Sequence, residues 1–156
     1  MQRFDLPPVW LAGFAVLAWL QAQFAGLGLS LAHPVSALLG GLLVGGGLVL
    51  TGLAVIEFRK HRTTIMPHET PDVLIQTGIY KRSRNPIYLG DVLILAGLIL
   101  YWDAVLSLLL VPVFVRILEK RFIEPEEDRM RRRFRASYAR YAEKTGRWFQ
   151  FSRDGD

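Results

Sequence analysis

The chain has 156 residues, of which 51% are hydrophobic, and it carries 19 lysines and arginines against 14 acidic residues. Its length fits one domain, and its apolar content exceeds what a soluble domain of this size usually needs. Because it contains no cysteine, disulfides, thiolate metal sites and cysteine nucleophiles are excluded. The net charge of +5 suits either an anionic membrane surface or nucleic acid, and its distribution decides between them.

Two long apolar segments open the chain and predict two membrane-spanning helices. The first covers residues 9–31 and the second covers residues 35–58. Each exceeds the roughly 20 residues that cross a bilayer. His33-Pro34 separates them and predicts a turn, because proline restricts the backbone of the residue before it. Cleavage of the first segment as a signal peptide is the alternative, which the long apolar run and the scarcity of preceding positive charge disfavour.

Glycines in the second segment predict close packing between helices. Gly41 and Gly45 form a G-x-x-x-G pattern, in which the missing side chains let two helix backbones touch. The alternative is a dinucleotide-binding loop. It is disfavoured because no strand precedes these glycines and their spacing differs from G-x-G-x-x-G.

A polar segment and two shorter apolar segments follow. Residues 59–85 contain two prolines and are predicted to form a loop on the membrane surface. Residues 86–101 and 103–121 are predicted to form a tight helical hairpin, with Asp103 capping its second arm. Each arm is short for a span, so tilt and local thinning of the bilayer must compensate. A re-entrant hairpin or a buried pair of soluble core helices is the alternative.

The last segment, residues 124–151, is predicted to form an amphipathic helix with an interfacial tail. Apolar residues recur three or four positions apart along one helix face, and arginines occupy the other face. Aromatic residues near the end suit the membrane–water interface. The predicted fold class is therefore an all-α integral membrane protein with about four transmembrane helices and this C-terminal helix.

The positive charges predict an orientation in the membrane. Only Arg3 precedes the end of the second span, and the turns near residues 33 and 102 contain no lysine or arginine. Four spans place both termini and the 59–85 loop on one side, which the positive-inside rule makes cytoplasmic. The basic clusters flank membrane segments, so membrane lipids are the expected partners and nucleic acid is not. The three histidines lack a metal-ligand spacing such as H-E-x-x-H, and no metal is expected.

Two polar segments carry the candidate chemistry. Pro86 suits the first turn of a helix, and Asn85 can cap it. A helix N-terminus attracts anions, and Arg84 adds a planar, bidentate donor there. Glu126 and Glu127 open the last helix, where they either complement the helix dipole or hold a polar ligand. Taken alone, the segment around Arg84 and Pro86 is better explained as a capped helix start with interfacial arginines than as an anion-binding site.

Taken together, these segments resemble the isoprenylcysteine carboxyl methyltransferase and phospholipid methyltransferase superfamily. The resemblance rests on Arg-Asn-Pro-x-Tyr-Leu-Gly at 84–90, Glu-Glu-x-x-Met-x-x-x-Phe at 126–134 and Arg-Trp at 147–148. It covers roughly residues 58–149, which is more than half of the chain. It implies a methyltransferase embedded in the membrane that uses S-adenosylmethionine as its cofactor.

The resemblance also implies where ligands bind. The cofactor would lie at the cytosolic mouth of the helix bundle, against Tyr80, Asn85, Pro86, Tyr88, Gly90, Glu126 and Glu127. Arg84 and Arg147 would face the substrate, and together with Glu127 they are the candidate catalytic residues. The acceptor is expected to be a lipophilic carboxylate, amine or thiol that enters from the bilayer. The alternative is a non-catalytic membrane structural or interaction protein with the same fold.

Two residues depart from the family pattern. Asn85 stands where the eukaryotic carboxyl methyltransferases have histidine. Asparagine can still form hydrogen bonds but, unlike histidine, does not titrate. Arg135 stands where a glycine usually follows the phenylalanine. If that position needs a positive φ, the last helix is arranged differently in this chain.

Overall fold

The computed structural model describes residues 5–24, 30, 33–63 and 72–150. Within these ranges the regular elements are all helical, which confirms the predicted all-α class. Parts of three predicted segments lie outside these ranges: residues 25–29 and 31 of the first span, residues 64–71 of the loop and residue 151 of the tail.

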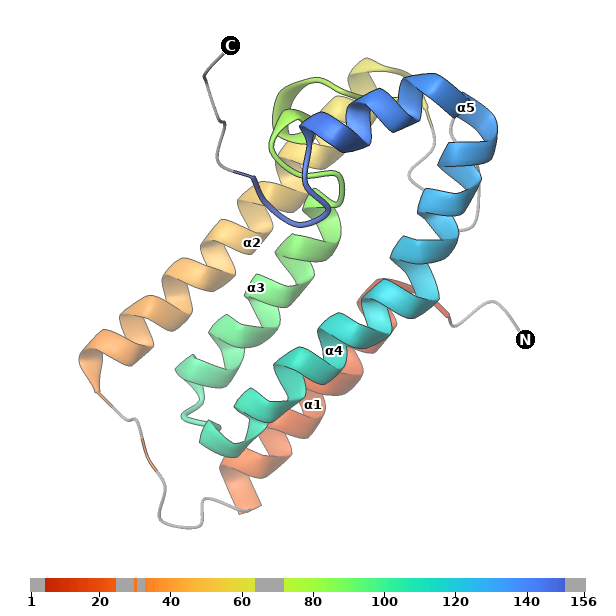
Figure 1. Ribbon diagram of the computed structural model, residues 1–156. Helices are drawn as coiled ribbons and strands as arrows, with labels where there is room; N and C mark the ends of the chain where they lie inside the picture. The colour runs from red at the N-terminus through yellow and green to blue at the C-terminus, as the bar shows by residue number, and fades with distance from the viewer. Residues whose placement is uncertain (1–4, 25–29, 31–32, 64–71, 151–156) are drawn as a thin grey trace.

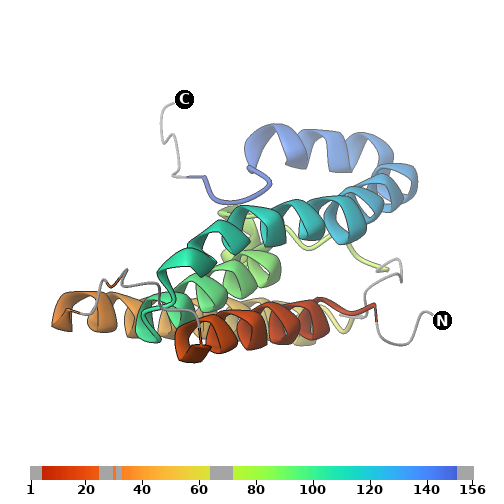
Figure 2. The same ribbon diagram turned by 90° about the horizontal axis from the view of Figure 1, so that it is seen from below.

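The helices form an elongated bundle with one helix folded across its end (Figures 1 and 2). Figure 1 shows α2 beside α3, and α3 and α4 running in opposite directions. A 3-10 turn, Val105–Leu109, precedes α4, and a π-helical turn, Glu119–Ile123, joins α4 to α5 without a break. In chain order the α-helices are α1 (Pro7–Phe24), α2 (Pro34–Lys60), α3 (Pro86–Tyr101), α4 (Leu110–Leu118) and α5 (Glu124–Lys144).

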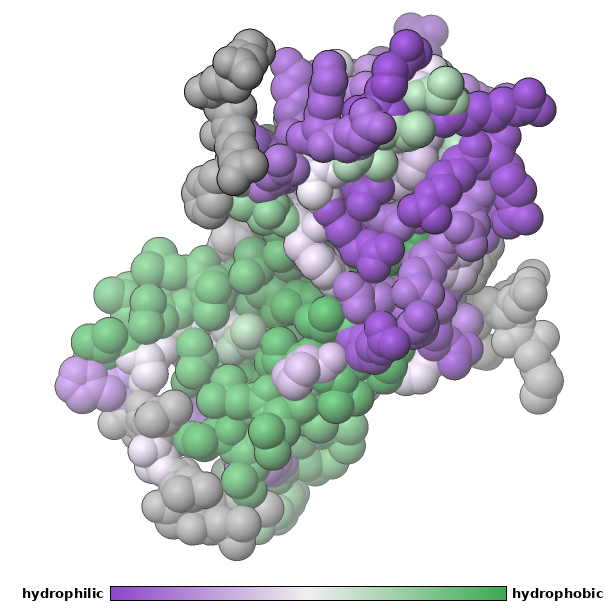
Figure 3. Space-filling model, in the orientation of Figure 1, coloured by the Kyte–Doolittle hydropathy of each residue, from purple (hydrophilic) through white to green (hydrophobic). Residues whose placement is uncertain are grey.

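Of the helices in the described ranges, α2 is the one both long and apolar enough to cross a membrane. Its 27 residues extend about 40 Å, which exceeds the ~30 Å hydrocarbon core. Large apolar side chains remain exposed along it, among them Leu38, Leu42 and Val49. Figure 3 shows an apolar surface at one end of the molecule and a hydrophilic surface at the other. The four-span arrangement and the membrane hairpin of α3 and α4 remain predictions.

Glycines bring α2 and α3 into backbone contact, but they are not the predicted pair. A Cβ on Gly47 would lie 2.6 Å from the Gly90 carbonyl oxygen, and one on Gly97 would lie 2.6 Å from the Gly40 carbonyl oxygen. Gly41, in contrast, has no atom within 4 Å of a Cβ position, and neither has its predicted partner in the G-x-x-x-G pattern. The prediction was wrong because glycine spacing along one helix does not reveal which face its neighbour matches.

The helix termini differ in part from the sequence expectation. Pro86 opens α3 and Asn85 holds the N-cap position, but the Asn85 side chain makes no capping hydrogen bond. Asp103 does not cap a helix either, since it adopts a φ of 56° in the turn after α3. His33, which was not predicted to cap, accepts a hydrogen bond at Nδ1 from the backbone N–H of Val35 at the start of α2.

Two apolar clusters hold the bundle and the segment before α3. The larger lies among α1, α3 and α4, where the Phe14 and Phe114 ring centroids are 5.2 Å apart. The smaller packs Tyr80 against α2 through Ala54. Beside it, Glu57 at the end of α2 accepts a 2.5 Å hydrogen bond from the Thr77 hydroxyl. This contact fixes the polypeptide just before the polar residues that open α3.

Candidate functional site

A cavity of about 680 Å³ lies where α2 ends, α3 begins and α5 crosses the bundle. Its wall is mostly apolar, with contributions from the start of α1, the segment after α2 and α5. Ligand cavities in proteins are typically about 300–1,000 Å³ and combine an apolar wall with a few polar groups. The polar groups here include six of the predicted site residues, Tyr80, Arg84, Asn85, Tyr88, Glu126 and Glu127.

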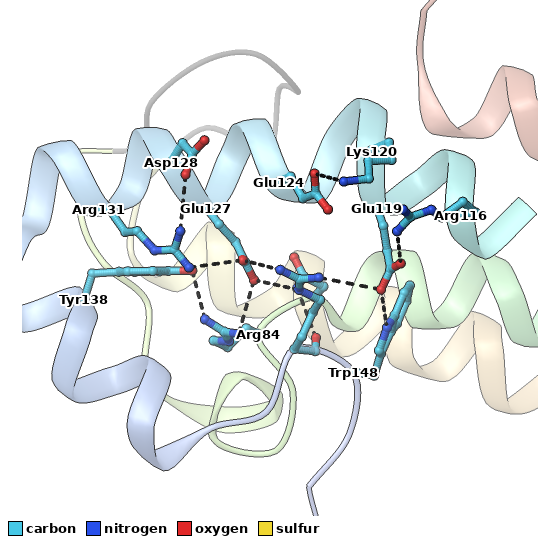
Figure 4. A network of polar contacts seen from close by, with 12 residues as sticks. Arg84, Arg116, Glu119, Lys120, Glu124, Glu127, Asp128, Arg131, Tyr138 and Trp148 are labelled. Atoms are coloured by element: carbon cyan, nitrogen blue, oxygen red, sulfur yellow. Dashed lines mark hydrogen bonds and ion pairs between the residues drawn. The ribbon is translucent and has the colours of Figure 1, made fainter.

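Glu127 forms the centre of a buried ion cluster (Figure 4). Its side chain is 5% exposed, and its Oε1 lies 3.2 Å from a terminal nitrogen of Arg84. The Arg147 guanidinium approaches in a fork, with Nη2 2.8 Å from Oε2 and Nε 3.2 Å from Oε1. Arg131 lies 3.7 Å from the same carboxylate. Charge-assisted, two-point contacts of this kind fix geometry as well as adding energy.

The ion cluster around Glu127 stabilises the positive charge of Arg147. Its hydrogen bonds with Glu127 raise the pKa of the Arg147 guanidinium above its ordinary value. Glu119 adds a further contact at 3.7 Å to Arg147 and accepts a 3.1 Å hydrogen bond from the Trp148 indole. Glu119 comes from the π-helical turn, an irregularity frequently found at functional sites.

The segment after α5 lies against the segment before α3. The backbone N–H of Arg84 donates to the carbonyl of Gly146 at 3.0 Å. The Asn85 side-chain amide donates to the carbonyl of Arg147, also at 3.0 Å. The Asn85 side chain therefore joins the start of α3 to the segment after α5 and does not cap the helix.

Tyrosines close the cavity on the α5 side. The Tyr138 hydroxyl accepts a 3.2 Å hydrogen bond from Arg84, and the Tyr141 hydroxyl donates to the Tyr80 carbonyl at 2.7 Å. Burial raises the pKa of both α5 tyrosines, so the Tyr141 hydroxyl remains protonated and able to donate. Across the cavity the Tyr88 hydroxyl donates to Glu126 at 2.7 Å.

Three of the predicted residues lie outside the cavity wall. Pro86 is fully buried at the start of α3. Gly90 packs on Gly47 of α2, so its missing side chain serves helix packing. Arg147 reaches the site through its ion pairs with Glu127 and Glu119.

Several residues that contact the site were not singled out from the sequence. Glu119 contacts Arg147 and accepts a hydrogen bond from Trp148, which the sequence motif did include, and Arg129 lines the cavity from α5. Glu119 is an acidic residue within an otherwise basic stretch, which was an available signal. Arg129 follows Glu126 by three positions, a spacing that puts both residues on one face of a helix, and this was an available signal.

Comparison with protein-family models finds a family that matches this chain. The model described as phospholipid methyltransferase matches residues 35–137, more than half of the chain. The match runs from α2 to the middle of α5 and includes the cavity-lining residues of α3 and Glu126–Glu127. Searches of curated proteins and of solved structures find no match. The chain belongs to the phospholipid methyltransferase family.

Proposed function

We propose that the protein is an integral membrane methyltransferase that uses S-adenosylmethionine to methylate a lipophilic acceptor. The observation that carries the proposal is a largely apolar cavity with a buried, charge-paired cluster on one wall, in a member of this family. Membership supports methyl transfer in general. The cofactor, the acceptor and the residue roles are argued from the cavity.

The residues present fit S-adenosylmethionine. This cofactor needs a surface for its adenine ring, acceptors for its ammonium and hydroxyl groups, and donors for its carboxylate. Tyr80 and Tyr138 offer aromatic surface, and Glu126 and Glu127 offer carboxylate oxygens in the same cavity. The Nε atom of Arg84, which lines the same cavity, is a buried donor without a hydrogen-bond partner in the described chain. When bound, the sulfonium would supply an electrophilic methyl group.

The acceptor is proposed to be lipophilic because of where the cavity lies. Pro7 and Phe58, at the ends of two apolar helices, contribute to its wall. A substrate held in the bilayer by its tail would place its head group near this level. Positioning of this kind lowers the entropic cost of bringing two reactants together. The apolar wall would also exclude water from the reacting groups.

Arg84 is the proposed substrate-side residue, and Glu127 is proposed to hold it in place. The Arg84 guanidinium is 12% exposed and lies between the Glu127 carboxylate and the Tyr138 hydroxyl. Arg147 grips the same carboxylate and so acts as a positioning residue. The three residues, predicted separately from the sequence, would then act as one unit.

Cofactor binding tests this proposal. Purified full-length protein is expected to bind S-adenosylmethionine in calorimetry, and Glu127→Gln is expected to weaken binding roughly 10- to 150-fold, the range for losing a charge-assisted hydrogen bond. Asp128→Asn, which alters an exposed acid one position later, is the matched control and is expected to bind like the wild type. Absence of binding by folded wild-type protein would reject the function. Unchanged binding by Glu127→Gln would reject only the role of that residue.

A further inference from the structure

Arg129 is a cavity-lining cation with an unsatisfied donor. It lines the cavity from the first half of α5, and its Nε atom is buried without a hydrogen-bond partner. No ion pair joins it to any residue in the part of the chain that the structure describes. Arg84, the other lining arginine, is neutralised by Glu127. A buried donor without a hydrogen-bond partner is costly, and the side chain carries a positive charge, so this position favours an anionic ligand that can accept a hydrogen bond.

The position of Arg129 separates it from the Glu127 cluster. Arg133, one helical turn later on the same face of α5, lies 3.8 Å from Asp72. The residues after Asp72, Val73 and Leu74, form part of the apolar wall. The face that carries Arg129 therefore looks toward this wall, whereas Glu127 faces Arg84 and the segment after α5.

We propose that Arg129 binds the anionic group of an amphiphilic acceptor, a carboxylate or a phosphate, whose tail lies along the apolar wall. Its planar fork of donors matches either oxyanion in a two-point contact. Arg129 is then a specificity-determining residue that selects acidic amphiphiles over neutral ones of equal length. This inference rests on the proposed function, because it takes the acceptor to share this cavity with the cofactor.

The test uses three probes with full-length protein in a nonionic detergent: dodecyl phosphate, dodecanol and inorganic phosphate. Calorimetry is expected to show wild-type protein binding dodecyl phosphate roughly 10- to 150-fold more tightly than dodecanol. Arg129→Gln is expected to abolish that preference and leave S-adenosylmethionine affinity unchanged. Arg129→Lys is expected to retain part of the preference. Arg132→Gln, an exposed arginine of the same helix, is expected to match the wild type.

Three outcomes would overturn the inference. The first is an unchanged preference in Arg129→Gln. The second is a loss of S-adenosylmethionine affinity in that variant in place of dodecyl phosphate affinity, because Arg129 would then hold the cofactor carboxylate. The third is equal binding of inorganic phosphate and dodecyl phosphate, because the tail would then contribute nothing. The failure of the proposed function is separable, since it appears as absence of S-adenosylmethionine binding by the wild type.

Discussion

Arg135 interrupts α5 with a backbone conformation that residues other than glycine rarely adopt. Its φ of 44° and ψ of −117° lie within a run of otherwise helical residues. The bend it makes turns the second half of α5 back over the bundle, where Tyr138 and Tyr141 meet Arg84 and Tyr80 (Figure 2). The glycine that the family resemblance leads one to expect here would adopt this conformation without strain. The chain therefore retains the bend with an arginine at this position, at the expense of backbone strain.

Replacing Arg135 with glycine is expected to stabilise the protein. Relief of a strained positive φ outweighs the added freedom of the unfolded chain, for a net gain of about 1 kcal/mol. Arg140→Gly is the matched control in the helical second half of α5, where it is expected to cost about 1 kcal/mol. Thermal unfolding in detergent should therefore move the two midpoints in opposite directions. A lowered midpoint for Arg135→Gly would show that the bend is not strained.

At this scale the sequence predicted the residues of the site better than their partners. Six predicted residues line one cavity, because the motif around Arg84 and the paired acids each carry a local signal. The direct pairing of Arg84 and Arg147 with one carboxylate was not predicted. It depends on the bend at Arg135 and on the pairing of the C-terminal segment, which involve residues far apart in the chain.

The contact between α2 and α3 rests on glycines placed two helical turns apart on both helices. Gly40 and Gly47 meet Gly97 and Gly90, respectively, with each backbone pressed against the other. In a bilayer, apolar burial does not drive helices together, so close packing of this kind contributes much of the association. The same contact sets the position of the first turn of α3, where Tyr88 enters the cavity.

An alanine at Gly47 is expected to destabilise this contact. Its Cβ would lie 2.6 Å from the Gly90 carbonyl oxygen and 2.7 Å from an Ile94 carbon, so the helices must separate. Overpacking of this kind typically costs about 1–3 kcal/mol. Gly46→Ala, whose Cβ would meet nothing within 4 Å, is expected to be neutral or stabilising because alanine favours helix. Equal unfolding midpoints for the two variants would argue against tight packing at Gly47.

Hydropathy and proline positions predicted the helices themselves, whereas the sequence contained fewer signals for how the helices are arranged. The structure has α2 and α3 at Pro34–Lys60 and Pro86–Tyr101, close to the predicted segments, because apolar content and prolines delimit both. The continuity of α4 with α5 was not predicted, since one predicted helix ended at residue 121 and the next began at residue 124, beside Pro125. Pro125 follows the π-helical turn, where the hydrogen-bond pattern is already irregular: the backbone N–H of Glu124 donates to the Glu119 carbonyl, five residues earlier.

Over the whole molecule, charge and apolar surface separate along the bundle axis (Figure 3). The hydrophilic end carries α5 and the end of α2, and residues of both line the cavity. Exposed leucines of α2, such as Leu42, lie on the apolar part. A bilayer would cover that part and leave the charged end at the head groups, where Lys81 is exposed. Orientation then depends on which side of the membrane the charged end occupies.

The charge distribution predicts that the charged end is cytoplasmic. Single cysteines at Lys81 and at His33 can report this in intact cells, because the native chain contains no cysteine to react. A membrane-impermeant maleimide is expected to label Lys81→Cys only after the membrane is opened, and His33→Cys without that step. The physical reason is that lysine and arginine in short flanking segments are retained on the cytoplasmic side. Labelling of His33→Cys only after opening would contradict the four-span arrangement, since an even number of spans must separate residue 81 from the C-terminus and an odd number must separate it from residue 33.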